Sequence, residues 1–484
     1  MRLRGPRWAA VLWLSAATVG TGCGLPASAP ITPAPAPRTR VDIQSLVERG
    51  CYRCLERAYR EAVEEAPAGA LGSAQASEAA ILLAARSKEL GLPYESWLTR
   101  AQAILPPGPD WTDYIAIVRS LRIDPLSDDR DRILEETLAY RATRETVAAW
   151  RADLAASAGS AAFRAYLDLS LVCQNMVEDR ASALRAAEEH FHDVPLVAYR
   201  IGLCGPSQTA RLLAVREADP EFAEADLALG RYALDIPRQP DQEEALRRLT
   251  AARAAFPQSP AIVGSLGSLR EDREEWTDAL EAYEATLALV PTHRDALLGR
   301  TVTLSRMNRY EDAIAAATHI LELGSWFTGE AYYWRAWNFY HLSRIEEARA
   351  DTDRAKGLMH SAPVLVLSGM IEWHEHRLDT SETELQTALT IDAGQCEAAF
   401  LLGVVRAEQR QWAPGAAAFD LAQRCYDLSV TLRRETIARI TAGPGSEEGK
   451  LRQIARQQRV MNEEVQHRDD AADNAARLQR RAGV

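Results

Sequence analysis

The apolar residues of this chain recur with a helical period rather than with the strict alternation of a β-strand. Long stretches rich in Ala and Leu place apolar residues three and four positions apart, and short turns separate these stretches. Residues 77–109, for example, show a helical pattern, a Gly-Leu-Pro turn, a second helical pattern and a proline-rich stop. The pattern predicts an all-helical protein built from helical hairpins.

A repeat is visible in the second half of the chain. Small residues open the second helix of each candidate unit with separations of 34, 34, 35, 33 and 34 residues. These residues are Ala245, Ala279, Ala313, Ala348, Ser381 and Gly415. Leu-Gly pairs recur in the first helices, at 229–230, 266–267 and 402–403. Small residues are needed where two helix axes approach closely, and large residues fill the space on either side.

This 34-residue helix–turn–helix period resembles the tetratricopeptide repeat (TPR) family. The resemblance implies a right-handed α-solenoid, with six TPR units over residues 225–428. We interpret residues 41–224 as helical hairpins of degenerate, TPR-like character. Residues 429–484 are expected to form a C-terminal helical cap or tail, because a solenoid needs a polar terminal element and the sequence here is strongly polar.

The N-terminus has the pattern of an export signal. Three arginines within the first seven residues precede an apolar run from Trp8 to Val19, and small residues lead to Cys23. The apolar run is shorter than the roughly 20 residues that a membrane-spanning helix needs. The end of residues 1–22 resembles the lipobox of bacterial lipoproteins, although Gly20 stands where that family usually has Leu. An ordinary signal peptide followed by an incidental cysteine is the alternative.

The lipoprotein resemblance implies cleavage before Cys23 and acylation of that cysteine. Gly24 stands at the position where Asp would retain a lipoprotein in the inner membrane, which implies sorting to the outer membrane. Residues 24–40 alternate Pro with small residues, a composition typical of an extended spacer. We therefore expect an exported protein of the bacterial cell envelope, anchored by lipid to the outer membrane and facing the periplasm.

Six further cysteines are candidates for disulfides, because an exported chain can retain them. They are Cys51, Cys54, Cys173, Cys204, Cys396 and Cys425. In the TPR register the last two lie at neighbouring ends of two antiparallel helices, which allows them to pair. The middle two are 31 residues apart, nearly one repeat, and fit equivalent helices of adjacent hairpins. The C-x-x-C pair is interpreted as a structural disulfide or as two oxidised thiols.

Composition and motifs argue against several classes of function. The net charge is −12, from 56 basic and 68 acidic residues, which disfavours nucleic acid as a partner. The stretch GPGSEEGKL lacks the spacing and the magnesium-binding hydroxyl of a phosphate-binding loop. The histidine pairs in EWHEHRL and EEHFHDV are two residues apart, so they point to different sides of a helix and cannot chelate one metal. We expect no metal, no cofactor and no enzymatic activity.

The stretch YYWRAWNFYHL, residues 332–342, contains six aromatic residues in a chain that is 7% aromatic. One helical stripe, Tyr332, Ala336 and Phe339, occupies positions that the repeat uses for packing. A second stripe of aromatic residues lies on another side of the same helix. By the TPR resemblance this side of each first helix lines a concave groove. The groove is expected to contain Tyr333, Trp337, Tyr340, Met370, Trp373 and Phe400.

These observations predict an envelope-located TPR scaffold or adaptor that binds a peptide or protein partner in its groove. A surface glycan-binding lipoprotein is an alternative, because aromatic grooves also stack on sugar rings. An enzyme with its site in residues 41–224 is a third possibility. The C-terminal helix could also fold back and fill the groove with Leu451, Ile454, Met461 and Val465, in place of a partner.

Overall fold

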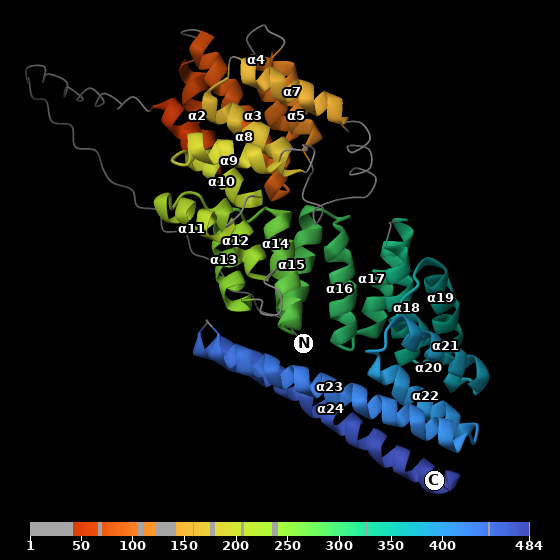
Figure 1. Ribbon diagram of the computed structural model, residues 1–484. Helices are drawn as coiled ribbons and strands as arrows, with labels where there is room; N and C mark the ends of the chain where they lie inside the picture. The colour runs from red at the N-terminus through yellow and green to blue at the C-terminus, as the bar shows by residue number, and fades with distance from the viewer. Residues whose placement is uncertain are drawn as a thin grey trace, which may run out of the picture. The chain divides into compact units, whose positions relative to one another are not determined.

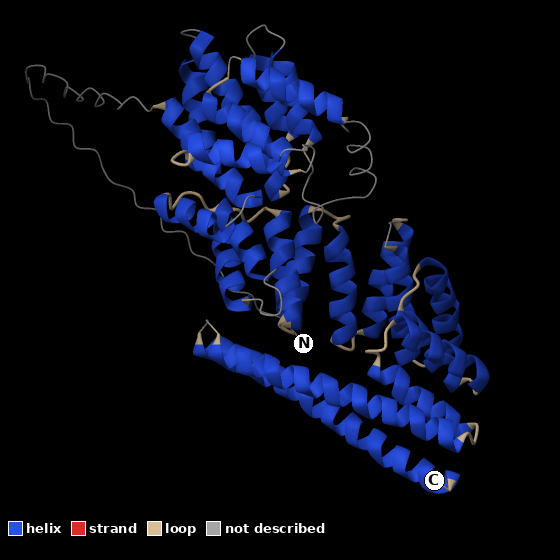
Figure 2. Ribbon diagram, viewed as in Figure 1, coloured by secondary structure: helices blue, strands red, loops and turns tan. Residues whose placement is uncertain are grey.

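The computed structural model describes ten stretches of the chain. They are residues 42–65, 70–104, 110–121, 142–157, 159–174, 180–204, 208–234, 241–324, 327–443 and 446–483. All regular secondary structure in these stretches is helical (Figure 2). None of the described helices is long and apolar enough to cross a membrane. The predicted signal peptide, Cys23 and the linker at 24–40 lie outside the described residues.

The first ten described helices precede the repeat array. They are α1 (Ile43–Arg49), α2 (Tyr52–Glu65), α3 (Ala70–Leu90), α4 (Glu95–Ile104), α5 (Asp110–Ser120), α7 (Arg144–Ala156), α8 (Ala161–Cys173), α9 (Arg180–Phe191), α10 (Pro195–Cys204) and α11 (Gln208–Ala218). Helix α3 is the centre of this part, because residues 79–85 are all buried. A helix that is apolar on every side must be surrounded by protein. Helices α1, α2, α4 and α5 pack directly against α3. Tyr166 of α8 and Arg200 of α10 donate hydrogen bonds to its residue Glu89.

Six helical hairpins follow (Figure 1). They are α12 (Glu224–Leu234) with α13 (Gln242–Ala255), α14 (Pro260–Asp272) with α15 (Trp276–Leu289), α16 (Arg294–Arg306) with α17 (Tyr310–Glu322), α18 (Thr328–His341) with α19 (Ile345–Leu358), α20 (Ala362–His374) with α21 (Leu378–Ile391), and α22 (Cys396–Glu408) with α23 (Trp412–Ala442). The predicted fold class is confirmed, since the described chain is an all-α solenoid of TPR-type hairpins.

The small residues that revealed the repeat are buried between the two helices of each hairpin. Ala279, Ala313 and Ser381 have no exposed surface. A Cβ atom added at Gly267 would lie 2.7 Å from the ring of Tyr283, and one at Gly403 would lie 2.8 Å from the ring of Phe419. The glycines therefore mark points where a large side chain of the second helix contacts the backbone of the first.

The turns inside the hairpins follow the same period. In the five hairpins whose turns are described, one turn residue has φ between 54° and 62°. These residues are Glu274, Asn308, Ser343, His376 and Arg410. They lie two residues after the end of the first helix, where a left-handed residue commonly terminates an α-helix. Gly or Asn would adopt this conformation at the lowest cost. Only one of the five is Asn, so residue preference alone did not reveal these turns.

The sixth unit departs from the others at its second helix. Helix α23 contains 31 residues and continues to Ala442, so the expected end of the repeat array at residue 428 falls inside a helix. Helix α24 (Glu447–Ala482) is the expected polar C-terminal helix and has 36 residues. The two long helices pack against each other, and the side chain of Ser429 donates a hydrogen bond to Glu464 across their interface.

The six cysteines lie in the three expected pairs. The Cα–Cα distance is 4.9 Å for Cys51–Cys54, 5.5 Å for the pair at 173 and 204, and 5.4 Å for the pair at 396 and 425. All three distances are within the range that a disulfide spans. The last pair joins the start of α22 to the middle of α23, as the TPR register predicts.

Candidate binding groove

Helix α18 contains both aromatic stripes, and the structure gives them different environments. Ala336 and Phe339 are buried in a cluster with Leu367 and Ile371 of α20. Tyr332 remains partly exposed, with the guanidinium groups of Arg335 and Arg354 5.6 and 5.5 Å from its ring centre. The first stripe therefore contributes core packing through two of its three residues.

The second stripe forms an aromatic surface that is only partly buried. Tyr333 and Trp337 have ring centres 6.5 Å apart, and the ring of His341 lies 4.8 Å from that of Trp337. Tyr340 contacts His374 of α20 edge-on, with a centre distance of 6.4 Å. Burial raises the pKa of both tyrosines, so their hydroxyls remain protonated donors at neutral pH. The result is a set of adjoining rings that spans two successive units.

The expected groove continues on the next two first helices. Met370 and Trp373 of α20 are partly buried, and the indole Nε1 of Trp373 donates a 2.9 Å hydrogen bond to Glu408 at the end of α22. Phe400 of α22 contacts Phe419 edge-on at 5.2 Å and lies 6.4 Å from the ring of His467 in α24. The six residues expected to line the groove therefore occupy the first helices of three consecutive units.

Glu397 connects these surfaces electrostatically. Its charge raises the pKa of Tyr333 and Tyr340 in α18, after the larger effect of burial. It acts in the same way on Tyr426 of α23, whose pKa burial raises to about 12. The pKa of Glu397 itself is raised by burial among these groups and lowered in part by His467, although much of the residue surface stays exposed. The charge of Glu397 thus acts on tyrosines of two other helices, α18 and α23.

Sequence reasoning missed Glu397, Tyr426 and His467. A signal for the first was present, because Glu397 lies three residues before Phe400 and so extends the groove stripe of α22 by one turn. The other two are outside the first helices of the array. Tyr426 and His467 stack with ring centres 5.6 Å apart. Their position depends on how α24 folds back, which repeat periodicity does not determine.

Helix α24 covers the end of the groove in the sixth unit. Its residues Ala471, Ala475 and Leu478 are buried in one cluster with Phe400 and Val404. The residues expected to fill the groove behave differently: Met461 is buried, whereas Leu451 is 64% exposed. The second half of α24 therefore covers the groove at the last unit, through Ala471, Ala475 and Leu478, rather than at the aromatic surface of α18.

A separate polar cluster lies in the N-terminal region. Cys51, Cys54 and Asp219 are buried, and their potential ligand atoms lie within 4.8 Å of one another, the one such group of three within the described residues. The two cysteines are bonded to each other, and Asp219 accepts hydrogen bonds from Arg49 at 3.0 Å. The sulfur atoms are bonded to each other and the carboxylate is paired with Arg49, so we assign this cluster a structural role.

Solved structures with a similar fold are TPR proteins. A tetratricopeptide repeat protein from Parabacteroides merdae has 14% identity and a TM-score of 0.39, and the match covers 50% of this chain and 99% of that one. The Cut9 and Hcn1 assembly of the APC/C gives 12% identity, coverage of 90% and 89%, and a TM-score of 0.37. YrrB, described as a TPR protein with an unusual peptide-binding site, gives 19% identity, coverage of 37% and 91%, and a TM-score of 0.30.

Neither a protein-family model nor a curated protein sequence matches this chain. The identities to the solved structures are all below 20%, so the likeness concerns the fold alone. The assignment to TPR-type hairpins rests on the helix boundaries, the buried small residues and the regular left-handed turns of the chain itself.

Proposed function

We propose that this chain is a TPR scaffold or adaptor that holds a peptide or protein partner in the groove of its repeat array. One observation carries the proposal: Tyr333, Trp337 and Tyr340 form a second aromatic surface on α18 that the packing of the repeats leaves partly exposed. Aromatic side chains are the preferred anchors of protein interfaces. An apolar surface of this kind on a soluble domain usually marks an interaction site.

The partner expected for this surface is a segment with an apolar or aromatic anchor residue. Helix-in-groove and extended-peptide modes both use such anchors. Glu397 adds a negative charge that acts on Tyr333 and Tyr340, and the tyrosine hydroxyls add donors. The groove can therefore combine one buried apolar contact with hydrogen bonds that fix the orientation of the partner.

The location that we propose is the bacterial envelope, with the protein attached to the outer membrane through Cys23 and facing the periplasm. The cationic start, the short apolar run and the small residues before the cysteine support this proposal, as does the spacer at 24–40. A Cys23→Ala variant should move from the membrane fraction to a soluble exported fraction. Membrane association that is unchanged in this variant would contradict the anchor.

The groove is tested by site-specific crosslinking in intact envelopes. A photoreactive amino acid at Tyr340 should give a discrete crosslinked partner that mass spectrometry identifies. The Trp337→Ala/Tyr333→Ala variant should then capture that partner at least about tenfold more weakly, since an interface anchor is worth roughly 2 kcal/mol or more.

The matched control is Tyr332→Ala, which removes an aromatic ring from the same helix but outside the groove stripe. It should leave capture unchanged. If the groove variant keeps its partner and loses thermal stability instead, the second aromatic surface is additional core and the proposed binding role is wrong.

A further inference from the structure

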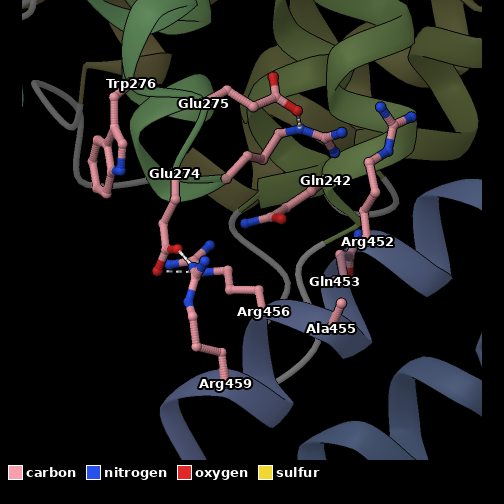
Figure 3. A pocket seen from close by; sticks show the side chains of 10 residues that line it. Gln242, Glu274, Glu275, Trp276, Arg452, Gln453, Ala455, Arg456 and Arg459 are labelled. Carbon is pink, nitrogen blue, oxygen red and sulfur yellow. Dashed lines mark hydrogen bonds and ion pairs between the residues drawn. The ribbon is translucent and has the colours of Figure 1, made fainter. Parts of the chain in front are cut away.

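A second candidate site lies away from the aromatic groove, between the α14–α15 turn and the first half of α24. Here the structure has a pocket of about 500 Å³. Three arginines of α24 line one side of it, namely Arg452, Arg456 and Arg459, and Trp276 lies on the other side (Figure 3). Arg273 also lines the pocket. Four guanidinium groups around one pocket are unexpected in a chain whose net charge is −12.

The three arginines of α24 are neighbours because of their spacing. Positions 452, 456 and 459 are separated by four and three residues, so they share one face of the helix. Helix α24 also packs on α23 here, since Arg433 donates a hydrogen bond to Gln457, while Arg456 and Arg459 pair with Glu274 in the α14–α15 turn. Figure 3 shows Arg456 and Arg459 both directed at that carboxylate.

The positive charge on the two walls is balanced unequally. Arg273 is compensated, because it donates to Glu243 at 2.7 Å and to Glu275 at 2.8 Å. Arg456 and Arg459, in contrast, both pair with the single carboxylate of Glu274.

Arg452 has the weakest compensation of the four. Its one described ion pair is with Glu448 at 3.7 Å, and these side chains are 58% and 83% exposed. Such a pair contributes little in water. Burial lowers the pKa of Arg456, and repulsion from Arg433 and Arg273 adds to this effect, while Asp272 partly offsets it. The α24 wall therefore presents three guanidinium groups in one row, and the exposed Arg452 is the one whose donors are least engaged.

We propose that this pocket binds a compact tetrahedral oxyanion, either a phosphate or a sulfate group of a small ligand. Arginine presents several N–H donors in a planar fork that matches phosphate oxygens. A tetrahedral anion has oxygens directed to both walls at once, whereas a planar carboxylate has only two oxygens on one edge. The indole of Trp276 at the rim offers a flat apolar surface for the rest of such a ligand.

Binding would redistribute the contacts of Glu274. The oxyanion would share the donors of Arg456 and Arg459 with this carboxylate and would add the donors of Arg452. The site is independent of the proposed peptide groove, since none of its residues belongs to the aromatic surface of α18.

The test is calorimetric titration of the purified protein at low ionic strength with three probes: inorganic pyrophosphate, sulfate and malonate. We expect one site for pyrophosphate and weaker binding of sulfate. Malonate carries the same charge as sulfate at neutral pH and should bind at least about fivefold more weakly than sulfate, because neither of its planar carboxylates directs oxygens to both walls at once. The affinity should fall as salt rises, since screening weakens exposed charge pairs.

Arg452→Gln is the diagnostic variant, because its side chain is exposed and makes no described hydrogen bond. Loss of one charge-assisted contact should weaken pyrophosphate binding by roughly fivefold to tenfold without changing the melting temperature. Arg452→Lys should recover part of the affinity. Arg477→Gln is the matched control, since it removes the same charge from an exposed position near the other end of α24.

Three results would overturn the proposal. The first is no saturable binding of pyrophosphate at millimolar concentration. The second is malonate binding as tightly as sulfate. The third is an equal loss of affinity in the Arg452→Gln and Arg477→Gln variants, which would show a response to net charge rather than to this pocket.

Discussion

The buried ion pair between Arg86 and Glu224 makes a sharp test of how the N-terminal helices join the repeat array. Arg86 lies in α3 with no exposed side-chain surface, and Glu224 is the first residue of α12 and 1% exposed. Their closest nitrogen–oxygen distance is 2.8 Å. The same carboxylate oxygen accepts the backbone N–H of Tyr52 at the start of α2, at 2.6 Å. One carboxylate thus connects three helices, and Glu224→Gln removes its charge with little change of shape.

The loss of folding stability expected for Glu224→Gln depends on the contacts that Arg86 keeps in the variant. Removing one partner of a buried pair typically costs about 3–5 kcal/mol, because the other charge stays buried without compensation. Arg86 keeps a second carboxylate, Glu89 at 2.9 Å, and the ring of Tyr199 at 3.8 Å. The amide oxygen of the introduced glutamine would also still accept the backbone N–H of Tyr52. We therefore expect a destabilisation near the lower limit, about 3 kcal/mol.

Hydrogen–deuterium exchange is the suitable assay, because a long repeat array need not unfold in one step. A loss of about 3 kcal/mol corresponds to exchange roughly 100-fold faster. The increase should be confined to α2, α3 and α12, and peptides from α20 and α21 serve as an internal reference. The surface pair of Arg49 with Glu221 gives the matched control: Glu221→Gln should change exchange by less than about fivefold, as expected for exposed pairs.

The double variant tests the cause. Arg86→Met in the Glu224→Gln background removes the uncompensated charge and should restore part of the stability, because apolar replacements of buried pairs are often tolerated. The coupling energy from the four proteins should reach about 1–3 kcal/mol. A double variant that is less stable than Glu224→Gln alone, or single-variant exchange within about threefold of the parent, would refute the reasoning.

Three further predictions concern the repeat array and the cysteines. Gly403→Ala should lower the free energy of unfolding by about 1–2 kcal/mol in chemical unfolding, because the new Cβ meets the ring of Phe419. Gly357→Ala is the control: a Cβ there has no atom within 4 Å, so the variant should raise the free energy of unfolding by about 0.5–1 kcal/mol. His376→Gly should stabilise by about 0.5–1 kcal/mol in the same assay, since φ is 57° there; no gain would mean that the turn tolerates a side chain without strain. The six cysteines paired in the structure should all resist alkylation under denaturing, non-reducing conditions, and any modified one would exclude its pair.

The repeat array could be predicted from the sequence because the two helices of each hairpin pack in the same way, with small residues at equivalent positions. The spacing of Ala279, Ala313 and Gly415 alone placed the close helix contacts in register. The same register located the pair Cys396–Cys425, whose Cα atoms lie 5.4 Å apart. Contacts between residues within one repeat length depend on helix geometry, which the period determines.

Less of the first half of the chain could be predicted from the sequence, because its packing is not periodic. Helix α3 is buried on all sides, and its polar residues Arg86 and Lys88 are satisfied by partners far along the chain or by backbone carbonyl groups. Local pattern predicts a helix there, but it cannot predict that a glutamate 138 residues away supplies the counter-charge. Buried polar networks of this kind are determined by tertiary structure rather than by sequence spacing.

The two candidate sites also differ in how far sequence spacing could predict them. The aromatic stripe of α18 was visible in the sequence, because three residues on one helix suffice to define a surface. Glu397 adds to that surface through its charge, which acts on Tyr333 and Tyr340 although they lie two units earlier in the array. The arginine pocket depends on a longer connection still, since Arg456 lies 182 residues from Glu274. A solenoid makes its hairpins predictable one by one, whereas its binding surfaces arise from residues that the superhelix brings together across several units.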